Sequence, residues 1–137
     1  MYRRTIAIAA ALSVLALGSQ LIIGCSNSAG DIHFRSGDLK YERGNYQGAI
    51  DDYTKVIELA YVSRGAAKFK SGDAQGGIAD FDKAIEINPQ NAVNYYNRGT
   101  AKQLVGDLKG ACADWEESIS FPGNEDLAWA EMEMYKC

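Results

Sequence analysis

Apolar and polar positions recur along this chain at a fixed interval of 34 residues. Ten residues of one stretch return 34 positions later with the same or a similar character: Tyr61 as Tyr95, Arg64 as Arg98, Gly65 as Gly99, Ala67 as Ala101, Lys68 as Lys102, Gly72 as Gly106, Asp73 as Asp107, Asp80 as Asp114, Phe81 as Trp115 and Ile85 as Ile119. An earlier copy lies 28 residues upstream, where Gly37 precedes Gly65 and Asp52 precedes Asp80. A period of this length is typical of stacked supersecondary units, because each unit cannot bury its apolar face alone.

Each copy is expected to fold as a helix, a turn and a second helix. In the third copy, the apolar residues after a break at Gly106-Asp107 recur at the intervals of three and four that mark one face of a helix: Leu108, Ala111, Cys112, Trp115 and Ile119. Glycine can end a helix in the left-handed conformation, and the aspartate after it can cap the next helix. Asn88-Pro89 ends the second helix of the second copy, because proline cannot continue the helical hydrogen bonds.

The junction between the first and second copies is six residues shorter than the next one. Only Leu59-Ala60-Tyr61 stands where residues 87–95 stand at the following junction, and no turn-forming residue is among them. The flanking helices either shorten into a tight turn near Ala60 or fuse into one helix from about Ala49 to Lys70, roughly 33 Å long. A fused helix would prevent the first copy from stacking on the second and would invite dimerisation by exchange of elements. The packing residues on both sides remain in place, which favours the tight turn.

A last helix is predicted over residues 124–137. Pro122 and Gly123 mark a turn before it, and Asn124 can cap it. The apolar residues expected to face the third copy are Leu127, Ala128 and either Met132 or Met134. Stacked repeats need such a cap over their last apolar surface. The acidic residues of this helix are expected to form a solvated face rather than a metal site.

The repeated unit resembles the tetratricopeptide repeat. Gly65 and Gly99 stand at that family's small position in the first helix. The family's small position in the second helix is occupied by Ala49 and Ala111, and its aromatic position by Tyr53, Phe81 and Trp115. Ala84 and Pro89 complete the pattern in the second copy. The chain departs from the pattern where Gly77, Val56 and Ser118 replace the usual alanine.

The resemblance covers about residues 31–123 and implies the fold. We expect an all-α, right-handed superhelix with three helix-turn-helix repeats at about residues 31–60, 61–92 and 93–123, followed by the capping helix. In this family the first helices of the repeats line a concave groove. The tetratricopeptide-repeat domain would thus occupy residues 31–137.

The resemblance also implies which residues line the groove. They are Phe34, Asp38 and Tyr41 in the first copy, Val62, Ala66 and Phe69 in the second, and Tyr96, Asn97, Thr100 and Gln103 in the third. Chaperone-binding relatives hold a terminal carboxylate with a lysine and asparagine clamp, and those basic residues are missing here at the corresponding places. An aromatic groove suits an extended or helical segment with apolar anchors, and Asn97 can bind its backbone. The aromatic residues have an alternative role in core or inter-repeat packing.

The N-terminal residues indicate export. Arg3 and Arg4 precede an uncharged apolar run, and residues 21–25, Leu-Ile-Ile-Gly-Cys, resemble a bacterial lipobox, whose cysteine family members lipidate and cleave before. We therefore expect a signal peptide at residues 1–24, a lipid anchor on Cys25 and a short linker at residues 25–30. An uncleaved transmembrane anchor in residues 1–24 and an ordinary signal cut near Ala29 are the alternatives.

Charge and residue types exclude several functions. Without residues 1–24, which hold two arginines, 12 basic and 18 acidic residues remain, and nucleic acid is a poor partner for such a chain. Cys112 and Cys137 are left as a pair, either bonded at one end of a helical hairpin or present as two thiols. His33 is the single imidazole, and no C-x-x-C, G-x-S-x-G or H-E-x-x-H motif occurs. We expect no catalytic residue, metal site or cofactor.

These observations together predict a lipid-anchored adaptor on the periplasmic side of a bacterial membrane, holding an envelope or membrane protein. Two alternatives stay open. One is a membrane-embedded assembly factor with an uncleaved N-terminal helix. The other is a structural protein that self-associates through the irregular first junction. The sequence identifies neither the partner nor the oligomeric state.

Overall fold

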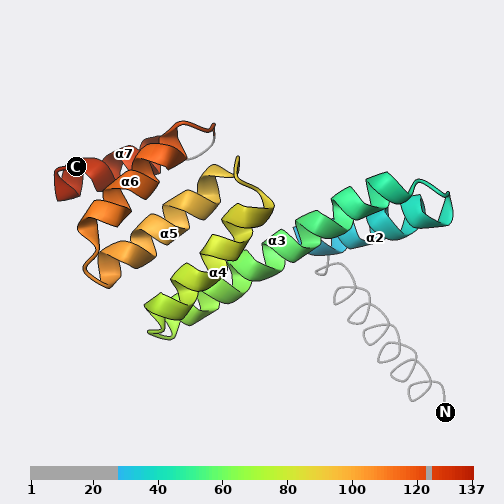
Figure 1. The fold of residues 1–137 in the computed structure, drawn as a ribbon, viewed down its shortest axis with the longest axis horizontal. Helices are drawn as coiled ribbons and strands as arrows, with labels where there is room; N and C mark the ends of the chain where they lie inside the picture. The colour runs from blue at the N-terminus through green and yellow to red at the C-terminus, as the bar shows by residue number, and fades with distance from the viewer. Residues whose placement is uncertain (1–27, 123–124) are drawn as a thin grey trace, which may run out of the picture. The chain divides into compact units, whose positions relative to one another are not determined.

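The computed structural model of this protein describes residues 28–122 and 125–137. These residues form helices in the order α2 (Ala29–Glu42), α3 (Tyr46–Lys70), α4 (Ala74–Ile87), α5 (Ala92–Leu104), α6 (Leu108–Ile119) and α7 (Glu125–Tyr135), with no strand among them (Figure 1). The predicted signal peptide or anchor at residues 1–24 and the candidate lipid anchor Cys25 lie outside the described residues, as do Gly123, Asn124 and the side chain of Leu127.

The chain divides into two compact units, Met1–Asp52 and Tyr53–Cys137. The described part of the first unit holds α2 and the beginning of α3. Helix α2 starts two residues before the expected domain boundary, because Ser28 caps it: the Ser28 hydroxyl accepts a hydrogen bond from the backbone N–H of Asp31, and the Asp31 carboxylate accepts one from the backbone N–H of Ser28. The second unit holds the rest of α3 and helices α4 to α7.

Helix α3 runs for 25 residues without a break at residues 59–61. The expected tight turn near Ala60 is therefore wrong, and the two helices of the first junction are fused. Leu59 and Ala60 are strong helix formers, and no glycine, proline or asparagine interrupts them. Local helix propensity and the missing turn residues decide the conformation here.

Two other turns of the described chain, between α3 and α4 and between α5 and α6, follow the glycine-aspartate pattern. Gly72 and Gly106 have φ values of 94° and 88°, in the left-handed region that glycine adopts without strain. The carboxylates of Asp73 and Asp107 then accept hydrogen bonds from backbone N–H groups in the first turns of α4 and α6, at 2.8 and 2.9 Å. These caps satisfy donors that the helix itself leaves unpaired.

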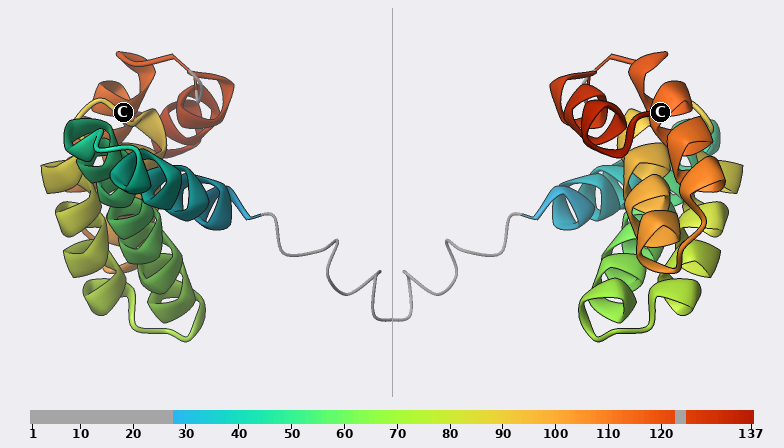
Figure 2. Two further views of the ribbon diagram at one scale, coloured as in Figure 1. Left: turned by 90° about the vertical axis from the view of Figure 1, so that its right-hand side faces the viewer. Right: turned by 90° about the vertical axis from the view of Figure 1, so that its left-hand side faces the viewer.

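The second unit has two buried apolar clusters between its packed helices. Within it, α4 packs against α5, α5 against α6 and α6 against α7, and Figures 1 and 2 show them side by side. Ile78 and Phe81 of α4 form a buried cluster with Ala101 of α5. Trp115 of α6 is fully buried in a second cluster with Ala111 and with Ala128 of α7.

Helix α7 covers the end of the stack as predicted. Ala128 is fully buried, and Met132 packs against the Trp115 cluster, whereas Met134 is exposed. Of the two methionines that the sequence leaves as alternatives, Met132 is therefore the packing residue. The ring of Tyr135 also stacks on Trp115, with 5.6 Å between the ring centroids.

The two glycines at the small position of the first helices allow close helix packing. A Cβ atom on Gly65 would lie 2.9 Å from the Phe81 ring, and one on Gly99 would lie 2.7 Å from the indole nitrogen of Trp115. Both aromatic side chains are buried. The glycines are therefore required by the approach of α3 to α4 and of α5 to α6.

Candidate functional site

Predicted groove residues of the second and third copies form equivalent rows on two helices of the second unit. Val62, Ala66 and Phe69 on α3 are each 34 residues before Tyr96, Thr100 and Gln103 on α5. Within each row the residues are four and three positions apart, so each row lies on one face of its helix. All six side chains are partly buried, as is the neighbouring Asn97. We call these seven residues the α3–α5 face.

The apolar members of this face also contribute to the core. Val62, Ala66 and Phe69 pack against the cluster that contains Phe81 and Ala101. This cluster includes residues of α4 and α5, so the α3 row lies close to both helices. The row is therefore a half-covered apolar strip, with a packing role beside any role in binding.

Tyr96 lies between the face and the capping helix. Its ring packs against the cluster of Ala111, Trp115 and Ala128. Its hydroxyl lies 3.5 Å from a carboxylate oxygen of Glu131 on α7. Burial of the hydroxyl, followed by the negative charge of Glu131, raises the pKa of Tyr96 above its usual value. The phenol is therefore neutral at physiological pH.

The polar members of the face are Asn97, Thr100 and Gln103. Thr100 donates a hydrogen bond from its hydroxyl to the backbone carbonyl of Tyr96, at 3.0 Å. Asn97 and Gln103 are partly exposed on the same helix. Their amide groups can both donate and accept hydrogen bonds.

The predicted groove residues of the first copy belong to the other unit. Phe34, Asp38 and Tyr41 lie on α2, spaced four and three residues apart, and all three are exposed. The ring of Tyr41 meets that of Tyr46 edge-on, with 5.4 Å between the centroids. The three residues form one row on their own helix.

The structure adds a repeated ion cluster in the second unit that sequence reasoning missed. In the second repeat, the buried Asp80 accepts hydrogen bonds from Nε and Nη2 of Arg64 at 2.8 and 2.6 Å, and Lys68 Nζ lies 3.0 Å from the same carboxylate. The hydrogen bonds from the Arg64 guanidinium lower the pKa of Asp80 to about 2. The side chains of Arg64 and Lys68 are themselves 60 % and 35 % exposed.

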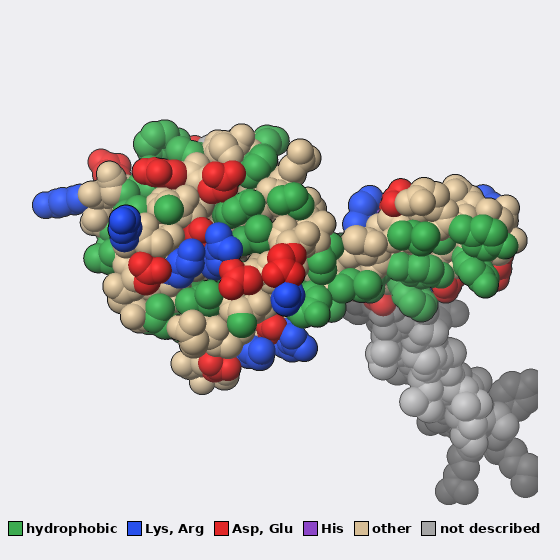
Figure 3. Space-filling view, viewed as in Figure 1, with side chains coloured by type: hydrophobic (Ala, Val, Ile, Leu, Met, Phe, Trp, Pro, Cys, Tyr) green, Lys and Arg blue, Asp and Glu red, His purple; other side chains and the backbone are tan. Residues whose placement is uncertain are grey.

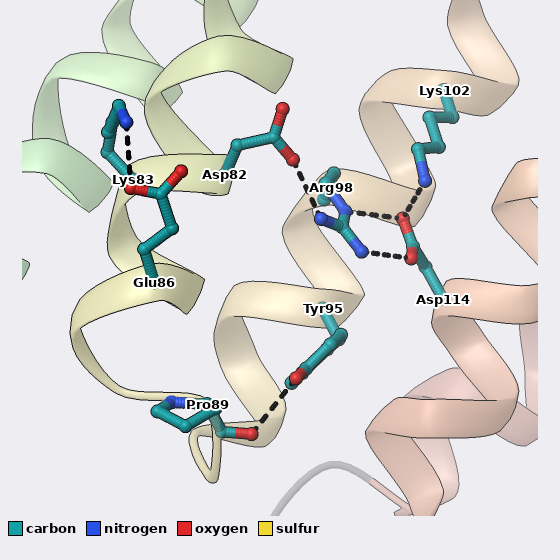
Figure 4. Close-up of polar contacts among 8 residues, drawn as sticks. All are labelled: Asp82, Lys83, Glu86, Pro89, Tyr95, Arg98, Lys102 and Asp114. Atoms are coloured by element: carbon teal, nitrogen blue, oxygen red, sulfur yellow. Dashed lines mark hydrogen bonds and ion pairs between the residues drawn. The ribbon is translucent and has the colours of Figure 1, made fainter.

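Figure 4 shows the equivalent cluster of the third repeat, whose two cations are less exposed than those of the second. Asp114 accepts hydrogen bonds from Nε and Nη2 of Arg98 at 2.9 and 2.6 Å, and Lys102 Nζ lies 2.8 Å away. Arg98 also donates from Nη1 to Asp82 of α4, at 2.7 Å, so its guanidinium joins α4, α5 and α6. The hydrogen bonds that Arg98 donates to Asp114 raise the pKa of Arg98 above its usual value. Its side chain is 19 % exposed.

A related pair occurs in the first unit. Asp52 is the counterpart of Asp80, and Lys40 is the counterpart of Lys68. Lys40 Nζ lies 2.7 Å from the Asp52 carboxylate, and Nδ1 of His33 lies 3.8 Å from it. His33 is thus partly buried beside an aspartate. The shared spacing of lysine and aspartate in all three copies is the sequence signal that could have revealed these clusters.

A second polar cluster fixes the connection between α4 and α5. The buried carboxylate of Glu58 on α3 accepts hydrogen bonds from the side-chain amides of Asn88, Asn91 and Asn94, at 3.0, 2.6 and 2.8 Å. Asn94 is fully buried. Three donors on one carboxylate hold this connection against α3 and compensate the cost of burying the charge. The cluster is structural, because the amides surround the carboxylate.

A disulfide bond joins Cys112 of α6 to Cys137, two residues beyond the end of α7. The Cα atoms of the two cysteines are 5.6 Å apart, within the ordinary range for such a bond. The bond closes the hairpin of α6 and α7.

Metal-binding clusters and membrane-spanning helices are absent from the described residues. Among them, no group of three or more His, Cys, Asp or Glu side chains is arranged to hold a metal ion. Within residues 28–122 and 125–137, every helix is too short or too polar to span a bilayer.

Comparison with known proteins assigns the family. Two family models, both described as tetratricopeptide repeat, match residues 30–61, 59–91 and 81–113. A comparison with curated proteins gives no match.

Several solved tetratricopeptide-repeat domains have a similar fold. The Sgt2 domain from Aspergillus fumigatus is 26 % identical, with 78 % of this chain and 76 % of that chain covered and a TM-score of 0.56. The Arabidopsis OM64 domain is 24 % identical, with 79 % and 94 % covered and a TM-score of 0.57. The first domain of Spaghetti (RPAP3), bound to the HSP90 peptide SRMEEVD, is 23 % identical, with 78 % and 90 % covered and a TM-score of 0.57. The all-α fold predicted from the sequence is confirmed, and the chain belongs to the tetratricopeptide-repeat family.

Proposed function

We propose that this protein is a protein-interaction adaptor, which holds a segment of a partner protein against the α3–α5 face. The observation that carries the proposal is the repetition of one partly exposed row, at Val62, Ala66 and Phe69 and again at Tyr96, Thr100 and Gln103. Similar folds support it, since domains of RPAP3 were solved with the HSP90 peptide SRMEEVD and the HSP70 peptide SGPTIEEVD. A stacked pair of repeats offers such a segment a rigid surface.

The charges around the face favour a ligand of a different kind from those peptides. Both peptides end in an acidic EEVD sequence. In this chain, Arg64, Lys68, Arg98 and Lys102 form ion pairs with Asp80 or Asp114, so their charges are already compensated. The seven residues of the α3–α5 face are apolar, hydroxyl or amide residues. The proposed ligand is therefore an extended or helical segment with apolar anchors, whose backbone is held by Asn97.

The proposed site of action is the periplasmic side of a bacterial membrane. The lipobox-like residues 21–25 support a lipid on Cys25. The bond between Cys112 and Cys137 agrees with an oxidising compartment. Labelling of cells with a fatty-acid analogue should mark the wild-type chain and not the Cys25→Ser variant, whereas equal labelling of both would count against the anchor.

Site-specific photo-cross-linking tests the binding face directly. A photoreactive amino acid at Thr100 or Gln103 in the cellular protein should trap a partner. The same group at the exposed Glu116 of α6 is the matched control and should trap far less. Equal trapping at all three positions would contradict the proposed face.

A blocking substitution gives the expected loss of binding. Thr100→Arg places a long cation in the middle of the α5 row, where an apolar anchor would have to displace it, and we expect partner capture to fall at least about tenfold. Substitutions at Phe69 and Tyr96 are less suitable for testing binding, because the rings of these residues also pack in the core. Helix content measured by circular dichroism should be unchanged. Full capture by the Thr100→Arg variant would reject this face.

A further inference from the structure

One face of the first helix is covered in the third repeat and exposed in the second. In the third repeat, Ala101 of α5 is fully buried and the Arg98 side chain is 19 % exposed. The residues 34 positions earlier on α3 are Ala67, which is exposed, and Arg64, whose side chain is 60 % exposed. Ala60, four residues before Arg64, is also exposed and lies on the same side of the helix. We call Ala60, Arg64 and Ala67 the Arg64 face, and all three belong to the second unit.

Helix α4 covers the equivalent face of α5. Ile78 lies in the buried cluster with Ala101, and Asp82 accepts a hydrogen bond from Nη1 of Arg98 at 2.7 Å (Figure 4). Ile78 precedes Asp82 in the chain, whereas Ala101 follows Arg98, so the two helices run in opposite directions. Ile85 follows Asp82 by three residues and shares its side of α4. The occupant of such a face is therefore a helix with apolar residues on either side of a carboxylate.

The ion clusters of the two repeats differ by one negative charge. In the third repeat two cations meet two carboxylates, because Asp82 adds to the aspartate that both repeats share. Figure 3 shows basic and acidic side chains side by side over α4 and α5. In the second repeat, Arg64 and Lys68 both pair with Asp80, the one carboxylate within ion-pair distance of them in the described part of the chain. Each cation has a carboxylate contact, but this cluster keeps one positive charge in excess.

The guanidinium of Arg64 is oriented to accept a second carboxylate. Its Nε and Nη2 donate to Asp80, just as Nε and Nη2 of Arg98 donate to Asp114. The remaining nitrogen of Arg98, Nη1, bonds to Asp82. Nη1 of Arg64 has no equivalent bond among the described residues. A carboxylate at this nitrogen would give Arg64 the same set of contacts that Arg98 has.

Two features of the sequence explain why α3 does not supply this carboxylate itself. The helix continues through Ala60, so the residues before Ala60 cannot fold back onto those after it. The first-copy residue that corresponds to Asp82 is Thr54, 28 positions earlier, and threonine carries no charge. A second copy of the chain, packed in the register of the repeat, would likewise bring a threonine to Arg64. The missing charge therefore points to a different protein as the occupant.

A hollow of about 260 Å³ lies at one end of the Arg64 face. Its lining consists of Val56, Ile57, Ala60, Tyr61 and Arg64. The guanidinium of Arg64 lies over the Tyr61 ring, 5.2 Å from its centroid, so the charge stands at the rim of an otherwise apolar and aromatic surface. Such a hollow suits an aliphatic side chain that lies one helical turn from a carboxylate.

We propose that the Arg64 face binds an acidic amphipathic helix of a partner protein, packed antiparallel to the second half of α3. An aspartate or glutamate of that helix accepts a hydrogen bond from Nη1 of Arg64. An apolar residue four positions before the acid covers Ala67, and another, three positions after it, enters the hollow next to Ala60. Arg64 is two residues from both Val62 and Ala66, so this face points away from the α3–α5 face and is independent of it.

A designed helical peptide is the probe for this face. It carries isoleucine, aspartate and isoleucine at the spacing of Ile78, Asp82 and Ile85, on an uncharged background of alanine and glutamine. A second peptide differs only in an asparagine that replaces the aspartate. Fluorescence anisotropy with the full-length chain in mild detergent should show about tenfold tighter binding of the aspartate peptide, because its carboxylate completes the ion cluster. The difference should shrink at high salt.

Substitutions in the chain assign the preference to Arg64. Arg64→Gln should reduce the tenfold preference for aspartate to about twofold or less. Lys70→Gln is the matched control, because it removes an exposed charge of the same helix that lies off the face, and it should keep the preference. Arg64 also bonds to Asp80, so Ala60→Asp gives a second test at an exposed position without that contact. It places a negative charge in the hollow and should weaken binding of the aspartate peptide about tenfold, with native helix content by circular dichroism.

Further measurements separate this proposal from its alternatives. Thr100→Arg, which blocks the α3–α5 face, should leave binding of the peptide unchanged, so the two proposed sites fail independently. Sedimentation velocity of the wild-type chain should show no dimer that Ala60→Asp dissociates, since such a dimer would assign the face to a second copy and overturn the proposal. Absence of peptide binding, equal binding of the two peptides, or a preference for aspartate that survives Arg64→Gln would also overturn it.

Discussion

Replacing Asp114 by alanine is expected to lower the free energy of unfolding of the second unit by about 3 kcal/mol. The substitution leaves Arg98 and Lys102, whose side chains are only 19 % and 21 % exposed, without the carboxylate that compensates them. Asp82 still contacts Arg98, but it is itself 46 % exposed and reaches one nitrogen of the guanidinium. Removing one partner of an enclosed ion pair costs more than the pair contributes, because the remaining charge stays partly desolvated.

The equivalent substitution in the second repeat provides the matched comparison. Asp80→Ala removes the same contacts, but Arg64 is 60 % exposed and can turn into water. We therefore expect a loss of only about 1 kcal/mol. Urea unfolding monitored by tryptophan fluorescence measures the free energy of unfolding of both variants, since the two tryptophans of the chain lie in the second unit. Equal losses for the two variants would show that enclosure of the cations does not control the cost.

Loss of the bond between Cys112 and Cys137 is expected to cost about 3 kcal/mol, which corresponds to a fall in Tm of roughly 15 °C for a unit of this size. The bond closes a loop across 25 residues and ties the end of the capping helix to α6. Without it, α7 can separate from the stack and expose Ala128 and Trp115. Amide hydrogen exchange should then be faster in α7 than in α4 or α5.

A reductant titration separates this effect from the loss of a side chain. The wild-type protein should melt at lower temperature as reductant is added. The Cys112→Ser/Cys137→Ser variant should match the reduced protein and should not respond to the reductant. A wild-type Tm that is insensitive to reductant would contradict a stabilising role for the bond.

Local features of the fold were predictable from the sequence. Gly72-Asp73 and Gly106-Asp107 end one helix and cap the next with groups that are adjacent in the chain, so a sequence pattern identifies them. The close approach at Gly99 is likewise encoded at a fixed position of the repeat. These features depend on few residues and little tertiary context.

The conformation at Ala60 shows where the repeat pattern fails as a guide. Packing positions persist on both sides of the junction, and they favoured a turn. No residue there can end the helix, and Leu59 and Ala60 extend it instead. A period in the sequence thus predicts which faces are complementary, whereas the connecting residues decide whether those faces meet in the same chain.

Contacts between distant residues account for what the sequence did not reveal. Arg98 and Asp114 were both visible as repeated residues, but their hydrogen bonds depend on how α5 packs against α6. Glu58 meets Asn88 and Asn94 across 30 and 36 residues, and no short motif links them. The extent to which Tyr96 is covered also depends on where α7 lies. These are properties of helix packing, which a single sequence does not specify.

The continuity of α3 is the claim on which the account most depends, and one distance tests it. Spin labels attached at the exposed residues Lys55 and Lys70, both in the second unit, by chemistry that spares cysteine report the separation of two points of the helix on either side of Ala60. Labelled chain is diluted with unlabelled chain, so that each pair of labels lies in one molecule. A continuous helix predicts about 22 Å between the two Cα atoms. A separation below about 15 Å, as expected for two helices folded back at Ala60, would contradict it.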